Sequence, residues 1–338
     1  MATAAVVGCG DISVVHLKAI KNTAGADLVG VCDVDRTTAA AAGHRHDVPS
    51  FTDHRQLLER LQPDVVHLCT PHDEHAPVTV DSLRAGANVL MEKPLAHTLA
   101  AGQQIADAAA ERPSLKVGVC FQNRYNATSL AMRHLLDSGA MGEVRGGSAS
   151  VLWRRTPEYY RVRPWRGQQA RSGGGVLINQ AIHTLDLMQW FLGDVTAVQG
   201  DVGHYGEETQ DIDVEDTAHL VLEHRRGVRT LVYATTLHVA DSPITIEIVT
   251  DHALMHLRGD LTITYNDGRV ETVQDVPTVE TIGRSYWGTS HKLLVEDFYR
   301  RLPEPAPFWI GPDEAMKTMR ILTGAYGSRT ASASPSSR

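Results

Sequence analysis

A short apolar run that leads directly into a glycine-rich turn opens the chain and constrains its fold more than any other feature. Ala4–Val7 is apolar throughout, and Gly8-Cys9-Gly10-Asp11-Ile12-Ser13 follows it. In such a turn the first glycine allows a sharp reversal and the second lets a pyrophosphate approach the backbone. The N-terminus of the next helix adds free N–H groups and a positive dipole end. We expect a dinucleotide to contact Gly8, Cys9, Gly10, Asp11 and Ile12, with Ser13 departing from the usual third glycine or alanine.

Apolar runs and helical stretches alternate through the first 120 residues. The predicted strands are Ala4–Val7, Leu28–Cys32, Val65–Cys69, Val89–Met91 and Val117–Cys120. The predicted helices are Val14–Lys21, Arg36–Ala42, Gln56–Leu61, Pro77–Arg84 and Leu99–Ala110. Strands that are apolar on both faces are typical of parallel sheets covered by helices. The pattern predicts an α/β domain over residues 1–120, a doubly wound parallel sheet of the Rossmann type.

The pattern changes after residue 120 to one helix, Ala127–Leu136, followed by consecutive strands. These predicted strands include Val198–Val202, His219–Glu223, Arg229–Ala234, Ile244–Val249 and Leu261–Tyr265. Turn sequences such as Asn266-Asp267-Gly268 favour hairpins. We therefore expect a second, α+β domain over residues 121–327 with a large open, mostly antiparallel sheet and two closing helices, Lys292–Arg301 and Asp313–Ala325. The Ser/Ala-rich tail, residues 328–338, is predicted to be disordered.

Composition excludes several classes of protein. A chain of 338 residues is too long for one ordinary hydrophobic core, and its net charge of -8 disfavours nucleic acid as a partner. No stretch approaches the ~20 apolar residues that cross a bilayer, and the N-terminal segment lacks the positive charge of a signal peptide. No cysteine pair has CxxC spacing. These features indicate a cytoplasmic protein, with no membrane partner and with reduced, buried cysteines.

An acidic residue ends the second predicted strand, where a dinucleotide-binding fold places the acceptor for the ribose hydroxyls. Asp33 holds this position, followed by Val34 and Asp35. The two carboxylates would repel a 2′-phosphate, so we expect NAD in preference to NADP, although Arg36 could accommodate that phosphate. A helix cap or turn is the alternative role for Asp33.

Three further motifs resemble one known family. They are Thr70-Pro71-His72-Asp73-Glu74-His75, Ala87-Asn88-Val89-Leu90-Met91-Glu92-Lys93-Pro94, and the stretch from Gly173-Gly174-Gly175 through Asn179 and His183 to Asp186. Together with the glycine turn they resemble the glucose–fructose oxidoreductase / inositol dehydrogenase (Gfo/Idh/MocA) family. The resemblance implies a dehydrogenase that transfers a hydride between NAD(H) and a secondary hydroxyl of a sugar, sugar acid, sugar nucleotide or cyclitol. It further implies cofactor contacts at Thr70, Pro71, His75, Glu92, Lys93 and Gln122.

The same resemblance indicates the acid–base residues. Lys93 follows an apolar strand at the edge where ligands bind, and a partly desolvated lysine beside a nicotinamide would shift toward its neutral form. Asn179, His183 and Asp186 are spaced i, i+4 and i+7, on one face of an apolar helix that we expect to end near Gly193. The resemblance makes Lys93 and His183 the proton-transfer groups. Asn179 stands where the family has an aspartate, so Asp186 is the candidate to orient the histidine ring.

A basic, aromatic segment offers a substrate site. Trp153–Arg171 contains six arginines, interleaved with Trp153, Tyr159, Tyr160 and Trp165. Aromatic faces suit a sugar ring, and arginine suits carboxylate or phosphate. The segment suggests a substrate of uronate, sugar-phosphate or sugar-nucleotide type. We expect the carbohydrate or cyclitol substrate to contact Lys93, Tyr125, Arg163, Trp165, Arg166, Asn179 and His183. A subunit contact or a salt-bridged loop is the equal alternative for the segment.

Two other functions fit the same motifs: a glycosidase that uses NAD transiently, and a non-catalytic dinucleotide-binding regulator. The seventeen histidines form no convincing metal motif, so we expect no metal. An antiparallel sheet with too few helices to cover both faces, together with the resemblance, predicts a homodimer or homotetramer.

Overall fold

The computed structural model describes residues 1–209, 211–275 and 290–328. The chain divides into two compact units, Met1–Tyr125 with Pro277–Met316, and Asn126–Val276 with Lys317–Arg338. The predicted domain boundary after residue 120 stays a prediction beside this division. The tail expected to be disordered lies, apart from residue 328, outside the described residues.

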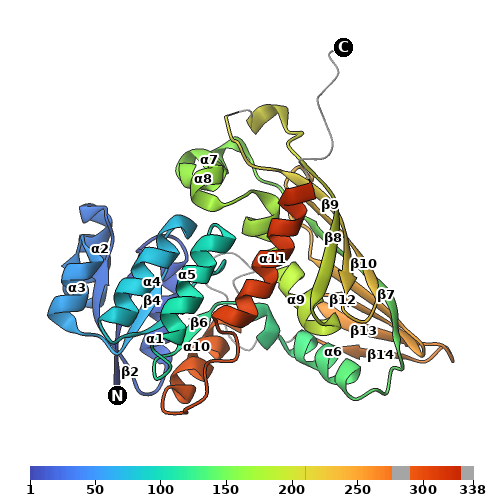
Figure 1. Cartoon of the computed structure of the whole chain (residues 1–338), viewed down its shortest axis with the longest axis horizontal. Coiled ribbons are helices and arrows are strands. Elements are labelled where there is room, and N and C mark those ends of the chain that lie inside the picture. The colour runs from blue at the N-terminus through green and yellow to red at the C-terminus, as the bar shows by residue number, and fades with distance from the viewer. Residues whose placement is uncertain (210, 276–289, 329–338) are drawn as a thin grey trace. The chain divides into compact units, whose positions relative to one another are not determined.

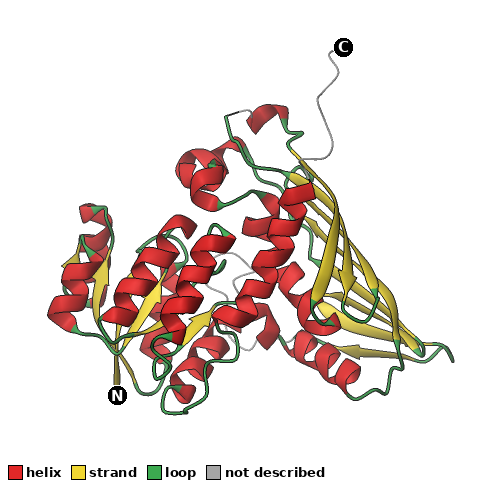
Figure 2. Cartoon of the chain, viewed as in Figure 1, coloured by secondary structure: helices red, strands yellow, loops and turns green. Residues whose placement is uncertain are grey.

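The first unit is built on a six-stranded parallel sheet (Figure 2). Its strands are β1 (Ala2–Val7), β2 (Ala26–Cys32), β3 (Ser50–Phe51), β4 (Val65–Leu68), β5 (Asn88–Met91) and β6 (Val117–Val119). Their order is β3-β2-β1-β4-β5-β6, the Rossmann arrangement, so the carboxyl ends of β1 and β4 meet where the order reverses. The prediction of a doubly wound parallel sheet is confirmed.

Helices complete this unit: α1 (Ser13–Asn22), α2 (Arg36–His46), α3 (His54–Leu61), α4 (His75–Arg84), α5 (Leu99–Ala110) and α10 (Ser290–Arg301). Side chains cap three of them, because Asp35, Asp53 and Thr98 accept a backbone N–H at the start of α2, α3 and α5. Helix α10 packs against α1. His291 of α10 also contacts Glu92, which lies 199 residues earlier in the sequence.

The second unit contains an eight-stranded sheet in the order β14-β13-β12-β11-β7-β10-β9-β8. Its strands are β7 (Val144–Leu152), β8 (Val195–Gly203), β9 (Thr217–His224), β10 (Arg229–Thr235), β11 (Thr245–Thr250), β12 (Ala253–Arg258), β13 (Asp260–Tyr265) and β14 (Val270–Val273). Only the central pair, β7 and β10, runs parallel among these strands. The predicted large, mostly antiparallel sheet is confirmed.

Helices lie on one face of this sheet. They are α6 (Ala127–Asp137), the short α7 (Pro157–Val162) and α8 (Gln169–Ser172), α9 (Ile182–Leu192), and α11 (Pro312–Ser328), whose first residues belong to the other unit. Helices α9 and α6 pack on strands β7, β13 and β14 (Figure 1). Buried and exposed residues alternate along the strands, so the face under these helices is the core of the unit.

The opposite face of the sheet carries exposed apolar side chains. Leu231 and Tyr233 of β10 are exposed, and Val249 of β11 is paired with Leu254 of β12, both exposed as well. Tyr233 stacks on His219 of β9, with ring centroids 4.9 Å apart. No described helix combines the length and the apolar character needed to cross a bilayer. All four cysteines are free thiols, three of them buried and Cys9 half-buried.

Candidate functional site

The glycine turn has the geometry of a dinucleotide cradle. Gly8 has a φ of 90°, and a Cβ there would lie 2.6 Å from the backbone of Cys69, so only glycine fits. A Cβ at Gly10 would meet nothing within 4 Å, which leaves open space over the turn. The Ser13 hydroxyl donates to the Gly10 carbonyl at 2.6 Å, so serine is accommodated at the third motif position. Helix α1 has no side-chain cap, although the Ser13 N–H donates to the Gly10 carbonyl at 3.1 Å and the Val15 N–H to the Ile12 carbonyl at 3.0 Å. The positive end of the helix dipole still favours a phosphate at this turn.

Asp33 lies at the carboxyl end of β2, tied to the turn. Its carboxylate accepts the Cys9 N–H at 2.8 Å and the Asp35 N–H at 2.9 Å. The capping role belongs to Asp35, which accepts the Thr38 N–H at 2.7 Å, and this hydrogen bond lowers the Asp35 pKa. A carboxylate has about four acceptor positions, so Asp33 retains capacity for ribose hydroxyls. Val34, also predicted to contact the cofactor, is 91% exposed.

The loop after β4 presents an unpaired hydroxyl. Thr70 Oγ1 is buried and has no hydrogen-bond partner among the described residues. The neighbouring His75 ring is fully buried, with Nδ1 2.8 Å from the Pro94 carbonyl and Nε2 3.1 Å from the Thr70 carbonyl. Burial lowers the His75 pKa. His75 therefore joins the loop after β4 to the loop after β5.

The loop after β5 begins with a buried carboxylate. Glu92 Oε1 lies 3.1 Å from His16 Nε2 of α1 and 3.2 Å from His291 Nε2 of α10. Although burial opposes ionisation, these two hydrogen bonds hold the pKa of Glu92 well below its usual value. Lys93, the next residue, is half-buried and precedes a cis peptide bond to Pro94. Neither histidine partner could be predicted, because His16 and His291 lie 76 and 199 residues from Glu92 in the sequence.

The loop after β6 places Gln122 and Tyr125 in a short 3₁₀ turn, Gln122–Tyr125. Gln122 is buried. The Tyr125 hydroxyl donates to Asp297 Oδ2 at 2.7 Å and accepts from the Trp309 indole N–H at 2.8 Å, all within the first unit. Burial and the Asp297 carboxylate raise the pKa of Tyr125. The hydroxyl expected to bind substrate therefore already donates one hydrogen bond and accepts another.

One group of described side chains could hold a metal ion. Single ligand atoms of His16, Glu92 and Cys120 lie within 4.8 Å of one another, and all three residues are buried. The sequence motifs did not indicate this cluster. The distances from both histidines to one Glu92 oxygen are those of hydrogen bonds, so the carboxylate is satisfied by the protein itself.

The first unit fits a dinucleotide. The open space over Gly10, the uncapped start of α1, the spare acceptor capacity of Asp33 and the orphaned Thr70 hydroxyl all lie at the carboxyl ends of β1, β2 and β4. A pyrophosphate would occupy the first two features and a ribose the third. Asp11 and Ile12 complete the turn that carries them.

In the second unit a buried carboxylate fixes the glycine-rich segment. Glu215 accepts the N–H of Gly175 at 2.7 Å, the N–H of Leu177 at 3.0 Å and the Tyr326 hydroxyl at 3.0 Å. A Cβ at Gly175 would lie 1.8 Å from the Glu215 carbonyl oxygen, and one at Gly174 would lie 2.0 Å from the Tyr326 hydroxyl. Glycine is required at both positions because the backbone and Tyr326 come so close.

The predicted stripe of Asn179, His183 and Asp186 is corrected by the structure. Leu177–Ala181 is a π-helical turn, and the α-helix α9 begins only at Ile182. Asn179 therefore does not share one regular α-helical face with the other two, because a π turn rotates it out of register. Its amide donates to the carbonyls of Gly174 and Gly175 at 3.2 and 3.3 Å.

The other two residues of the stripe lie in α9, which ends at Gly193 as predicted. His183 is half-buried. Asp186 is 1% exposed, and its Oδ1 accepts from the Thr318 hydroxyl at 3.4 Å. The Asp186 carboxylate therefore has a partner on α11 besides any role toward the histidine ring.

The basic segment is less uniformly charged than its composition suggests. Arg155 is buried, forms an ion pair with Asp241 at 2.8 Å and stacks on Trp153 at 4.9 Å. Arg161 pairs with Glu158 at 2.8 Å. Carboxylates therefore compensate the charges of two of the six arginines in this segment.

Arg166, a predicted substrate residue, packs on two aromatic rings of the segment. The Arg166 guanidinium lies 4.5 Å from the Tyr159 ring centroid and 5.8 Å from that of Trp165. Arg163 and Trp165 occupy the short turn between α7 and α8, and both are half-buried. The structure thus places the Arg166 guanidinium against the rings of both Tyr159 and Trp165.

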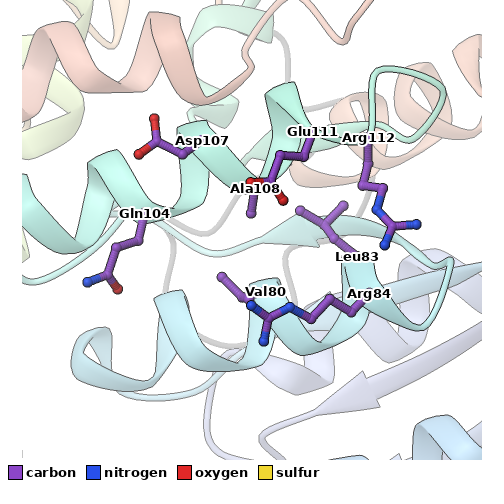
Figure 3. Close-up of a pocket in the computed structure, with 8 residues that line it drawn as sticks. All are labelled: Val80, Leu83, Arg84, Gln104, Asp107, Ala108, Glu111 and Arg112. Carbon is purple, nitrogen blue, oxygen red and sulfur yellow. The ribbon is translucent and has the colours of Figure 1, made fainter.

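A separate groove lies on the outer side of the first unit, between α4 and α5, with a volume of about 300 Å³ (Figure 3). It is lined by Val80, Leu83, Arg84, Gln104, Asp107, Ala108, Glu111 and Arg112. These residues come from α4, from α5 and from Glu111 and Arg112, which directly follow α5. The groove contains none of the predicted cofactor residues.

Comparison with known proteins gives a consistent picture. Residues 2–121 match the family model described as "Oxidoreductase family, NAD-binding Rossmann fold", and residues 129–256 match the GFO/IDH/MocA C-terminal domain. The chain is 28% identical to the D-apiose dehydrogenase of Paraburkholderia graminis over 68% of its length, and 30% identical to the inositol 2-dehydrogenase of Salmonella paratyphi B over 56%. The aligned part spans 59% and 54% of these relatives, a little more than half of each.

Among solved structures, the chain is similar to the WlbA dehydrogenase of Bordetella pertussis in complex with NADH and UDP-GlcNAcA. The TM-score is 0.82 at 26% identity, and the match covers 98% of this chain and 97% of the other.

Proposed function

The chain belongs to the GFO/IDH/MocA oxidoreductase family, and from this premise we propose that it transfers a hydride between NAD(H) and a secondary hydroxyl of a sugar, sugar acid, sugar nucleotide or cyclitol. The observation that carries the proposal is the glycine turn of the first unit, open over Gly10 and joined to Asp33 through the Cys9 N–H. The relatives that the chain matches are named as dehydrogenases of apiose and inositol.

NAD is proposed in preference to NADP. Asp33 ends β2 with its carboxylate held by two backbone N–H groups, and Asp35 stands at the cap of α2 close by in sequence. A 2′-phosphate on the ribose would bring a second negative charge beside Asp33, which is unfavourable. Hydroxyls on the same ribose would donate to it.

The proposed proton-transfer residues are Lys93 and His183. When bound, the nicotinamide supplies the hydride acceptor or donor. The lysine amine, half-buried at the carboxyl end of β5, orients the hydroxyl and holds or relays its proton. The His183 imidazole, half-buried in α9, accepts or returns a proton at the reacting oxygen. Asn179 and Asp186 are proposed as supporting polar groups. Asn179 is an amide in a π-helical turn before His183, and the Asp186 carboxylate follows His183 in α9.

An anionic carbohydrate is the proposed substrate class. Arg163 and Arg166 are the two arginines that we propose to meet the anionic group, and Trp165 supplies a flat apolar face beside Arg166. Arginine binds carboxylate or phosphate through paired donors, while an aromatic ring suits the apolar face of a pyranose. The similar WlbA dehydrogenase was solved with UDP-GlcNAcA, which supports a substrate of the sugar-nucleotide or sugar-acid kind.

A homodimer or homotetramer is proposed through the open sheet face of the second unit. Leu231 and Tyr233 on β10, and Val249 and Leu254 on β11 and β12, expose apolar area on that face, and contact of apolar surface with water is unfavourable. Pairing of two such faces would bury it. A monomeric mass by light scattering at micromolar concentration would contradict this part of the proposal.

The function is tested by NADH formation with a panel of sugars, sugar acids, sugar nucleotides and cyclitols, run with NAD and with NADP. The proposal expects NAD-dependent turnover of at least one panel member. Turnover that leaves bound NAD unchanged would indicate the glycosidase alternative, and tight NAD binding without turnover of any member would indicate a regulator.

A further inference from the structure

A continuous chain of buried polar side chains crosses the interior of the first unit beneath Lys93. The Tyr299 hydroxyl of α10 lies 2.9 Å from His67 Nε2 of β4, and His67 Nδ1 lies 2.9 Å from His16 Nδ1 of α1. His16 Nε2 then contacts Glu92 Oε1, which also contacts His291 Nε2. His16 and His67 are 0% exposed, and the other three are at most 7% exposed.

The protonation pattern of this chain is constrained. Because an ionised carboxylate only accepts, Nε2 of both His16 and His291 must donate to Glu92. Burial and the nearby His16 lower the pKa of His67 well below its usual value, so His67 is neutral and carries one ring proton. It therefore donates to one of its neighbours, His16 or Tyr299, and accepts from the other. A buried hydrogen-bond network of this kind fixes geometry strongly.

The network meets the backbone at the residue before Lys93. The Glu92 N–H donates to the Leu68 carbonyl at 2.9 Å, so main chain and side chain of Glu92 are both fixed. The two histidines reach this carboxylate from helices far apart in sequence, one of which begins at the glycine turn. On its other side Lys93 precedes Pro94, whose carbonyl oxygen lies 2.8 Å from Nδ1 of the buried His75.

We propose that His16 and His291 are positioning residues: by holding the Glu92 carboxylate they fix the backbone from which Lys93 projects, and so set the placement of its amine. The proposal rests on the proposed function only for its effect on turnover. Placement of the amine itself is independent of any substrate. Two other accounts compete, a merely structural buried network and a metal site formed with Cys120.

A matched pair of substitutions separates the roles of the two His16 nitrogens. The amide of His16→Gln reaches the position of Nε2 and can still donate to Glu92, whereas the shorter His16→Asn reaches only the position of Nδ1. Tyr299→Phe is the control for buried hydrogen-bond loss, because it breaks the far end of the chain without touching Glu92. We expect kcat to fall about ten-fold in His16→Asn, on the scale of one lost charged hydrogen bond. His16→Gln should keep most of the kcat.

The expected pattern also covers binding and stability. The Kd for NAD should change little in all three variants, and Tyr299→Phe should lower Tm while retaining kcat. Equal losses of kcat in His16→Asn and Tyr299→Phe, when Tm falls equally, would show a merely structural network and overturn the proposal. One zinc ion per chain in the purified protein, lost in both His16 variants and in Cys120→Ser, would show a metal site and overturn it too.

A substrate-free readout distinguishes failure of this proposal from failure of the proposed function. Trace acetylation with acetic anhydride, followed by peptide mass spectrometry, gives the reactivity of Lys93 relative to the exposed Lys21. We expect this ratio to change several-fold in His16→Asn and in His291→Asn, but not in His16→Gln or Tyr299→Phe. An unchanged ratio in both Asn variants would overturn the positioning role even if the enzyme turns over sugars. A changed ratio in a protein that oxidises no panel member would leave positioning supported and the proposed function rejected.

Discussion

The Cys9 N–H donates to the Asp33 carboxylate at 2.8 Å, so the glycine turn after β1 and the acid that ends β2 form one rigid unit. The second Asp33 oxygen is held by the Asp35 N–H. A cofactor ribose and its pyrophosphate would therefore meet groups whose relative positions are set before binding, which reduces the entropy that binding must overcome.

Asp33→Ala should weaken NAD binding about ten-fold to a hundred-fold, the scale of lost hydrogen bonds to a charged group. The preference for NAD over NADP should shrink at the same time, because the repelling charge is gone. Fluorescence titration with both cofactors measures this. Asp35→Ala is the matched control: it loses the cap of α2 at a cost of ~1 kcal/mol of stability but should keep most of the NAD affinity. Equal effects of the two changes would remove Asp33 from the ribose site.

Two glycine substitutions distinguish backbone strain from cofactor clearance. Gly10→Ala places a methyl group in open space, so Tm without cofactor should stay near that of the unchanged protein while NAD affinity falls. Gly8→Ala forces a Cβ against the Cys69 backbone at a φ of 90°, so it should lower Tm as well. Differential scanning calorimetry and NAD titration measure the two effects. Undiminished NAD affinity in Gly10→Ala would place the pyrophosphate elsewhere.

Several of these features could be predicted from the sequence, and others could not. Strands such as β1 and β5 are apolar on both faces and were found, whereas β7 contains Gly146-Gly147 and β3 has two residues, so neither carries a strand pattern. Pairing of His16 with Glu92 spans 76 residues, and that of Arg155 with Asp241 spans 86. Such pairs depend on the tertiary fold and leave no local trace. The π-helical turn Leu177–Ala181 begins beside a contact that is equally non-local, since Glu215 accepts the N–H groups of Gly175 and Leu177.

Acid should destabilise the first unit through Glu92 and His67. In the folded protein the pKa of Glu92 lies well below its ordinary value of 4.5. Its contribution to the free energy of unfolding is therefore complete above pH 4.5 and is lost as the pH falls below that value. The lowered pKa of His67 acts in the same direction from pH 6.5 downward, because the unfolded chain takes up the proton first. Urea unfolding at a series of pH values should show Glu92→Gln with a flatter acid limb. An unchanged slope would mean that other carboxylates dominate.

The arginine pair is expected to determine affinity for anionic substrates. The double variant Arg163→Gln, Arg166→Gln should raise the KM for an anionic sugar about ten-fold to a hundred-fold. The KM for a neutral sugar should change much less, because a neutral sugar loses no charge pairing. Steady-state kinetics on matched anionic and neutral substrates measures the difference. Arg161→Gln is the control, because its partner Glu158 compensates its charge. Equal effects on both substrate types would assign the segment to a subunit contact.

The proton-transfer residues are expected to act on turnover and not on cofactor binding. Lys93→Met and His183→Ala should each lower kcat ~100-fold or more, the usual scale of general acid–base catalysis, with little change in the Kd for NAD. Pre-steady-state measurement of NADH formation separates the chemical step from product release. Near-normal turnover in either variant would show that the substituted residue has no part in the reaction.

Direct transfer of deuterium tests the central claim, that this chain moves a hydride between a carbinol carbon and nicotinamide. The protein is incubated with NAD and a sugar or cyclitol deuterated at its carbinol carbons, and the reduced cofactor is examined by mass spectrometry. The account predicts NADH that carries one deuterium, formed by the unchanged protein and at least ~100-fold more slowly by Lys93→Met. Product formation from the deuterated substrate without any deuterium in the nicotinamide would contradict it.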